Sequence, residues 1–127
     1  MFSHIMLGAN DVQKSKAFYD ATLGALGYQP GVVDDKGRAF WISKSGIFAI
    51  STPINGEPAC HGNGGTIGFA AANPEAADAW HAAGVASGGT ACEDPPGIRE
   101  GSTGKLYLAY LRDPDGNKLC ALHRIVE

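Results

Sequence analysis

The strongest constraint in this chain of 127 residues is one order of elements, strand, helix, strand, strand, strand, which occurs twice. Short apolar segments between glycines and prolines carry the pattern. The first copy is predicted as a strand at 4–9, a helix at 10–26, an extended stretch at 28–34, and strands at 38–43 and 47–51. The second is predicted as a strand at 66–71, a helix at 74–86, an extended piece at 90–94, and a hairpin of 105–112 and 118–124.

Local signals mark where the helices begin and where the last hairpin turns. Asn10 or Asp11 can cap the first helix, whereas Asn73 can cap the second, with Pro74 in the first helical position that proline favours. The segment DPDGN at 113–117 predicts a tight turn. Proline fixes φ there, glycine accepts positive φ, and the Asp and Asn side chains bond to nearby backbone.

The two copies align with a constant offset at their start. Thr66 follows His4 by 62 positions, and Cys120 follows Ala49 by 71, so the second copy holds nine extra residues. We expect these in a loop at 95–104. The chain is therefore expected to be one domain over 1–127, with a first module at about 1–53 and a second at about 64–127.

Each such module has a sheet with one face under its helix and the other face uncovered. Two modules, or two chains, must close over each other to bury these faces. The sequence thus predicts an α+β fold of two tandem βαβββ modules, with eight strands around a cavity. A homodimer is expected for the same reason.

Alternation along the strands assigns their side chains to two faces. The apolar set is expected to lie beneath helices that carry Val12, Tyr19, Leu23, Ala77 and Trp80: Ile5, Leu7, Ile67, Phe69, Leu119 and Ala121. The other set mixes polar and small side chains: His4, Met6, Thr66, Gly68, Cys120 and Leu122. A mixed face of this kind suits a cavity wall better than a dense core.

Charge and cysteine usage exclude several classes of function. The net charge is -3 and no basic block is present, so nucleic acid is not an expected partner. No apolar run approaches the roughly 20 residues that span a bilayer, and the first thirty residues do not resemble a signal peptide. We therefore expect a soluble cytoplasmic protein without membrane contact. Cys60, Cys92 and Cys120 are expected as free thiols, and their spacing matches no zinc motif.

Three segments resemble the vicinal oxygen chelate superfamily, which includes glyoxalase I, extradiol dioxygenases, and fosfomycin and bleomycin resistance proteins. They are HIMLGANDVQKSKAFYDATLGALGY, GGTIGFAAANPEAADAWHAAG and YLRDPDGNKLCAL. Together they span nearly the whole chain. The DPDGN hairpin, preceded by an N-terminal His strand and an FY helix, is typical of the superfamily but not of one member's chemistry.

In metal-dependent members, this resemblance implies four ligand positions on the first and last strands of the modules. These positions match His4, Ala49, Thr66 and Cys120 here, where Glu or His would complete the set. Alanine cannot ligate, threonine is a poor ligand, and two remaining groups do not make a stable site. We therefore expect no cofactor and no tightly bound metal. The alternative is a divalent metal held by His4 and Cys120 with residues from elsewhere.

The candidate pocket residues each have two interpretations. His4 is a general base or donor, or a cavity-wall histidine. Cys120 is a buried small hydrophobe or, in contact with His4, a nucleophile. Tyr110 corresponds to a pocket tyrosine in similar fosfomycin resistance proteins, or it is an edge-strand aromatic.

Three further candidates depend on the register of strands or on loops. Thr66 shares the mixed face. Trp41 either lines the cavity or packs under the first helix, because the turn at 44–46 is ambiguous by one residue. Arg99, and with it Arg38, could reach an anionic ligand at the cavity mouth or be solvated.

Three functions are compatible with these residues. The first is a glyoxalase/bleomycin-resistance-like protein that binds a small molecule without metal at the inherited positions. The second is a glyoxalase-like lyase or dioxygenase-related enzyme acting on a small carbonyl, thioester or aromatic compound. The third is a partner-binding domain with a filled cavity. The catalytic residues of such an enzyme are not identified by the sequence.

Overall fold

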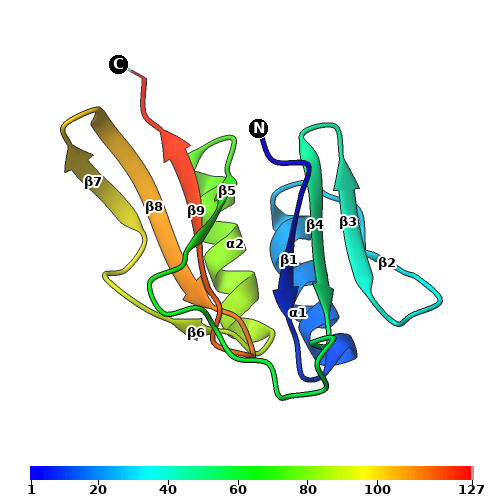
Figure 1. The fold of residues 1–127 in the computed structure, drawn as a ribbon. Coiled ribbons are helices and arrows are strands. Elements are labelled where there is room, and N and C mark those ends of the chain that lie inside the picture. The colour runs from blue at the N-terminus through cyan, green and yellow to red at the C-terminus, as the bar shows by residue number, and fades with distance from the viewer. Residues whose placement is uncertain (127) are drawn as a thin grey trace.

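The computed structural model describes residues 1–126 as an α+β fold with two β-sheets and two α-helices (Figure 1). The first module contains β1 (His4–Gly8), α1 (Val12–Ala25), β2 (Val32–Val33), β3 (Ala39–Ser43) and β4 (Gly46–Ser51). The second contains β5 (Ile67–Ala70), α2 (Pro74–Ala86), β6 (Thr90–Ala91), β7 (Gly97–Gly101), β8 (Gly104–Arg112) and β9 (Lys118–Arg124). The predicted repeat of elements is confirmed.

Both helices begin at the predicted signals. The Asp11 carboxylate caps α1 by accepting a bond from the backbone N–H of Lys14, so Asp11 rather than Asn10 is the N-cap. Asn73 caps α2 in the same way through the N–H of Ala76, with Pro74 in the first turn. At the end of α1, Gly27 takes a φ of +99°, and the next N–H bonds back to Leu23, which closes the helix.

The first strand of each module lies at one edge of its sheet. The strand orders are β1-β4-β3-β2 and β5-β9-β8-β6, and β7 pairs with β8. In both sheets the first strand runs parallel to the last, so β1 pairs with β4 and β5 pairs with β9. Since β1 and β5 are both edge strands, the two sheets meet along a line that we call the seam (Figure 1).

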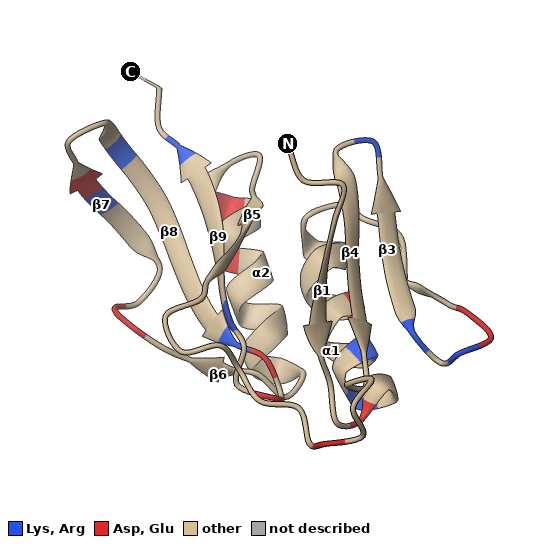
Figure 2. Cartoon of the chain, viewed as in Figure 1, with Lys and Arg blue, Asp and Glu red and all other residues tan. Residues whose placement is uncertain are grey.

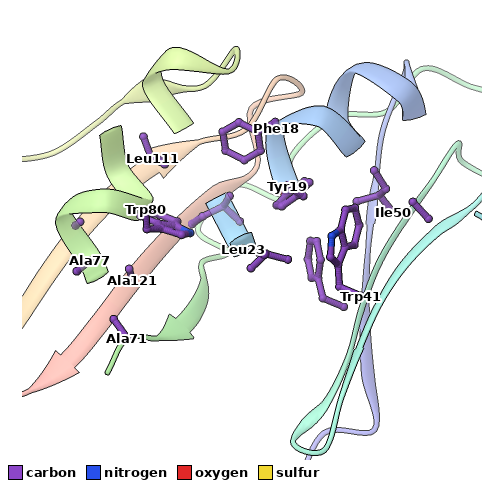
Figure 3. Close-up of a cluster of buried hydrophobic side chains, with 14 of the residues drawn as sticks. Phe18, Tyr19, Leu23, Trp41, Ile50, Ala71, Ala77, Trp80, Leu111 and Ala121 are labelled. Atoms are coloured by element: carbon purple, nitrogen blue, oxygen red, sulfur yellow. The ribbon is translucent and has the colours of Figure 1, made fainter. Parts of the chain in front are cut away.

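The helices lie together on one side of the sheets and contact each other (Figure 1). The predicted apolar set lies beneath them, because Leu119 and Ala121 are fully buried and Ile5, Leu7, Ile67 and Phe69 pack against the same core. Figure 3 shows Phe18 of α1 beside the second module and Tyr19 toward Trp41 of the first. We call the opposite surface of each sheet its bare face.

Gly84 lets the helices approach closely. A Cβ atom at this position would lie 2.3 Å from a methyl carbon of Leu111 and 3.2 Å from the Phe18 ring. Real Cβ atoms do not tolerate the first distance, so only glycine permits this packing of α2 between β8 and α1.

The segment expected as an inserted loop at 95–104 instead forms strand β7 and a tight turn. Residues Gly97–Gly101 pair antiparallel with β8, with Ile98 opposite Tyr107. The chain therefore has nine strands within residues 1–126, not the eight that were predicted. The two prolines before Gly97 lack the N–H groups that a strand needs, but every residue from Gly97 to Gly101 has one, so pairing resumes there.

The turn at 113–117 confirms the predicted local geometry and also joins the modules. Gly116 takes a φ of +90°, and Asp113 Oδ1 accepts bonds from the N–H groups of Asp115 and Asn117. Its Oδ2 atom accepts from Tyr19 Oη of α1 at 2.5 Å and from Asn117 Nδ2 at 2.9 Å. The buried Asp113 carboxylate thus binds four donors, one of them from the other module.

A second carboxylate of this turn binds the start of α1. Asp115 Oδ1 accepts from the backbone and side-chain N–H groups of Asn10, and its Oδ2 accepts from Ser15 Oγ at 3.0 Å. A negative charge at this end of α1 also interacts favourably with the helix dipole. The turn therefore attaches the last hairpin of the second module to the first helix of the first module.

Candidate functional site

The four inherited ligand positions lie at corresponding places in the two sheets. His4 begins β1, Ala49 lies in β4 opposite Met6, and Cys120 lies in β9 opposite Gly68. Thr66 is exposed and directly precedes β5. The alternation of side chains places His4 and Met6 on the bare face of the first sheet and Cys120 on that of the second.

These positions do not fit a divalent metal. Ala49 is fully buried and offers only a methyl group. Burial raises the pKa of the Cys120 thiol, and the nearby Glu93 carboxylate raises it further, so the thiolate that binds metals is disfavoured. Within residues 1–126, no group of three or more His, Cys, Asp and Glu side chains is arranged to hold a metal ion.

Cys120 and Tyr110 are direct neighbours across two antiparallel strands. They are register partners in β9 and β8, so both side chains point to the bare face of the second sheet. The packing around the sulfur is close, because a Cβ atom on Gly68 would lie 3.2 Å from Cys120 Sγ. Only 7% of Cys120 is exposed, and its protonated thiol is a weak nucleophile. These properties favour the interpretation of Cys120 as a small apolar wall residue.

A lysine and a glutamate border the same part of the bare face. Lys118 Nζ lies 5.1 Å from the centre of the Tyr110 ring and forms an ion pair with Glu93. Glu93 has a φ of +59°, in the left-handed region that non-glycine residues seldom adopt. Burial raises the pKa of the Tyr110 hydroxyl, and the negative charge of Glu93 raises it further. Tyr110 is therefore a neutral hydrogen-bonding group at physiological pH.

A separate pocket lies at the seam between β1 and β5. It is a pocket of about 180 Å³ whose walls come from α1, β3, β4 and β5. We call it the seam pocket. Its lining includes Leu23, Tyr28, Trp41, Phe48, Ile67 and Phe69, and also Ser3, His4, Ser43 and Ser45.

Two of the candidate residues, His4 and Trp41, border the seam pocket. The exposed His4 ring is bonded through Nδ1 to Ser3 Oγ at 2.8 Å. Trp41 packs under the first helix, which is one of its two predicted placements. Its ring centre lies 5.6 Å from that of Tyr19, and its Nε1 donates to Asp20 Oδ1 at 3.1 Å.

The other candidates are not brought into this pocket. Tyr110, Cys120, Thr66 and Arg99 are absent from its lining. Arg99 lies in β7, and its guanidinium donates to the carbonyl oxygens of Asp94 and Pro95 at 3.0 and 3.1 Å. Arg38 pairs with Asp34 and stacks on Phe40, with 5.3 Å from the guanidinium carbon to the ring centre. Both arginines thus bind their own module.

Two sets of residues were not identified from the sequence. One is the pair Lys118 and Glu93. Lys118 lies two residues before Cys120, so strand alternation would have placed Lys118 and Cys120 on one face. The other is the wall of the seam pocket, including Tyr28, Phe48 and Phe69. No sequence signal marks these, because Phe48 and Phe69 have the pattern of ordinary core residues and Tyr28 lies in the segment after α1.

Acidic and basic residues are interspersed over the chain, and no continuous basic face is visible in Figure 2. Among residues 1–126, no helix has the length and apolar character needed to cross a membrane. The strands at the seam, β1, β4 and β5, carry no charged residue (Figure 2).

Comparison with known proteins supports the resemblance seen in the sequence. The profile of the glyoxalase/bleomycin resistance protein/dioxygenase superfamily matches residues 1–121. A crystal structure of a glyoxalase/bleomycin resistance protein from Albidiferax ferrireducens T118 is 66% identical, with a TM-score of 0.95 over 98% of this chain and 99% of that chain.

More distant structures share the fold. A glyoxalase/bleomycin resistance protein/dioxygenase family enzyme from Burkholderia phytofirmans PsJN is 17% identical, with a TM-score of 0.73 over 97% of this chain and 98% of that chain. A lactoylglutathione lyase from Agrobacterium tumefaciens is 21% identical, with a TM-score of 0.65 over 96% of this chain and 92% of that chain. The comparison with curated proteins finds no match.

Proposed function

Because the chain belongs to the glyoxalase/bleomycin resistance protein/dioxygenase superfamily, we propose that it binds a small organic molecule without a metal at the inherited positions. The observation that carries this proposal is the replacement of the ligand set. Ala49 has no donor atom, Thr66 precedes its strand, and Cys120 holds its proton. A lyase or dioxygenase of the metal-dependent kind would need an ion that this set does not fit.

The bare face of the second sheet is the proposed ligand surface. Tyr110 offers a neutral hydroxyl, Lys118 offers a cation over the Tyr110 ring, and Cys120 and Leu108 supply an apolar floor. A few polar groups around an apolar surface are typical of small-molecule sites. This combination favours a compact ligand with an aromatic or apolar body and a polar substituent.

We expect purified protein to hold far less than one equivalent of zinc, nickel, iron or manganese. Elemental analysis measures the metal, and a thermal-shift screen with glutathione adducts, aromatic acids and bleomycin measures binding, because a true ligand stabilises only the folded state. At least one of these classes of compound should raise the unfolding temperature of the protein equally with and without EDTA. Stoichiometric metal that disappears in His4→Ala would show a metal site and favour the enzyme instead.

We also propose that the protein is a homodimer, since the bare faces need cover. Ile42 and Met6 lie on the bare face of the first sheet and are 67% and 42% exposed. A partner chain that covers these side chains would bury apolar surface and enclose the ligand surface of the second sheet.

The variant Ile42→Lys is expected to shift the dimer toward monomer by at least about tenfold in dissociation constant, because the interface would have to bury an unpaired ammonium group. Analytical ultracentrifugation over a concentration series measures this constant. Val85→Lys, at an exposed apolar position of α2, is the matched control and should leave association unchanged. Wild-type protein that remains monomeric at micromolar concentration would contradict the proposal.

A further inference from the structure

The seam pocket differs from the bare-face surface in position and in chemistry. Its most buried lining residues are Leu23 of α1, 2% exposed, and Trp41 and Phe48, which point from the first sheet to the helix side and are 4% and 7% exposed. Phe69 of the second module completes the wall, with its ring centre 5.3 Å from that of Phe48. Cys120 and Tyr110 lie on the bare face of the second sheet and are absent from the lining of the seam pocket, so the two surfaces have different walls.

The aromatic wall is fixed in place before any ligand binds. Asp20 Oδ1 accepts from Trp41 Nε1 at 3.1 Å and from the N–H of Gly31 at 2.8 Å. Gly31 lies so close to the indole that a Cβ atom there would be 2.7 Å from its ring. Trp41 is thus held by a hydrogen bond and by close packing against Gly31, and a ligand that stacks against this wall would lose little free energy in ordering it.

The rim of the pocket is polar, and the pocket is uncharged. Ser43 Oγ and Ser45 Oγ are 3.0 Å apart, and Ser43 also bonds to the carbonyl of Gly46. Ser3 and His4 border the same rim. The lining contains no Asp, Glu, Lys or Arg, so a charged group inside would be desolvated without an ion-pair partner of these types.

The volume of the pocket suits a single ring. An apolar cavity of about 150 Å³ lined by aliphatic and aromatic side chains is known to hold benzene, and the seam pocket measures about 180 Å³. We propose that the seam pocket is a second binding site, for a neutral molecule with one aromatic ring and one hydrogen-bonding substituent. The ring lies against Trp41 and Phe48, and the substituent meets the Ser43 and Ser45 hydroxyls.

Phenol is the probe for this site, with benzoate and cyclohexanol as comparisons. Each of the two tryptophans gives one indole N–H resonance in a ¹H–¹⁵N spectrum, and only Trp41 lines the pocket. Phenol should shift the Trp41 resonance, leave Trp80 in place, and saturate with a dissociation constant on the order of 1 mM. Benzoate, whose carboxylate would be desolvated with no Lys or Arg to pair with, and cyclohexanol, which is not planar, should each bind at least about tenfold more weakly.

Two variants test the location independently. Ile67→Trp fills the pocket from β5 and should weaken phenol binding at least about tenfold, whereas Ile98→Trp on β7 is the matched control and should not change it. Ser45→Ala, on the exposed turn, should weaken phenol severalfold without affecting toluene. Equal shifts of both indole resonances, benzoate binding as tight as phenol binding, or full phenol affinity in Ile67→Trp would each overturn the proposal.

Discussion

The variant Asp113→Ala is expected to lower the free energy of unfolding by about 3–4 kcal/mol, since it removes a buried network rather than one bond. Asp113 accepts from two backbone N–H groups of its own turn, from Asn117 Nδ2 and from Tyr19 Oη. Without the carboxylate, the fully buried Tyr19 hydroxyl loses the acceptor to which it donates. Urea denaturation followed by circular dichroism measures the change.

The control for this prediction is Asp35→Ala, which removes an exposed aspartate from the turn before β3. Its effect should stay within about 0.5 kcal/mol. Tyr19→Phe removes one of the four donors and should have an intermediate effect. If Asp113→Ala were no more destabilising than Asp35→Ala, the turn would not be what attaches the second module to α1.

Local sequence signals predicted the elements of the fold well. Asn73 and Pro74 marked the start of α2, and alternation placed Ile5, Phe69 and Leu119 beneath the helices, as the structure confirms. These signals work because caps and side-chain alternation depend only on neighbouring residues. Strand β7 was missed because Pro95, Pro96 and the surrounding glycines are typical of a loop. Its pairing with β8 is a contact between strands, which local sequence signals do not report.

The placement of the candidate residues was predicted only where strand register determines it. The turn at 113–117 sets the pairing of β8 with β9, and so brings Tyr110 opposite Cys120. The turn between β3 and β4 was ambiguous by one residue. In the structure Ser43 pairs with Gly46, which turns Trp41 toward Asp20 and α1. The hydrogen bond to Asp20, 21 positions away, is a tertiary contact that no local pattern reports.

The seam pocket could not be predicted, because it depends on how two sheets meet rather than on either sheet. Ile5 and Phe48 on one side and Ile67 and Phe69 on the other read as core positions, and they do pack against the core. Since β1 and β5 do not pair with each other, part of this core remains open at the rim formed by Ser43 and Ser45. The two sheets of the repeat therefore leave an opening where β1 and β5 face each other without pairing.

The variant Cys120→Glu is expected to affect ligand and metal binding in opposite directions. It places a carboxylate where metal-dependent relatives are expected to carry one, on the bare face beside Tyr110. The compound that stabilises the wild-type protein should lose on the order of a few kcal/mol of binding free energy, because the new charge must be desolvated beneath it. Zinc or manganese should gain weak, measurable affinity, because a hard oxygen ligand is added on the second sheet while His4 remains available on the first.

Isothermal titration calorimetry measures both changes, and Cys60→Glu is the matched control because Cys60 is an exposed cysteine outside the sheets. The gain in metal affinity should remain small, since Ala49 offers no ligand atom and Thr66 lies outside β5. It should disappear in the double variant with His4→Ala, since that removes the one inherited residue able to ligate. Cys120→Glu protein that binds both ligand and metal as the wild type does would place Cys120 outside the working surface, and the proposed bare-face site would then be wrong.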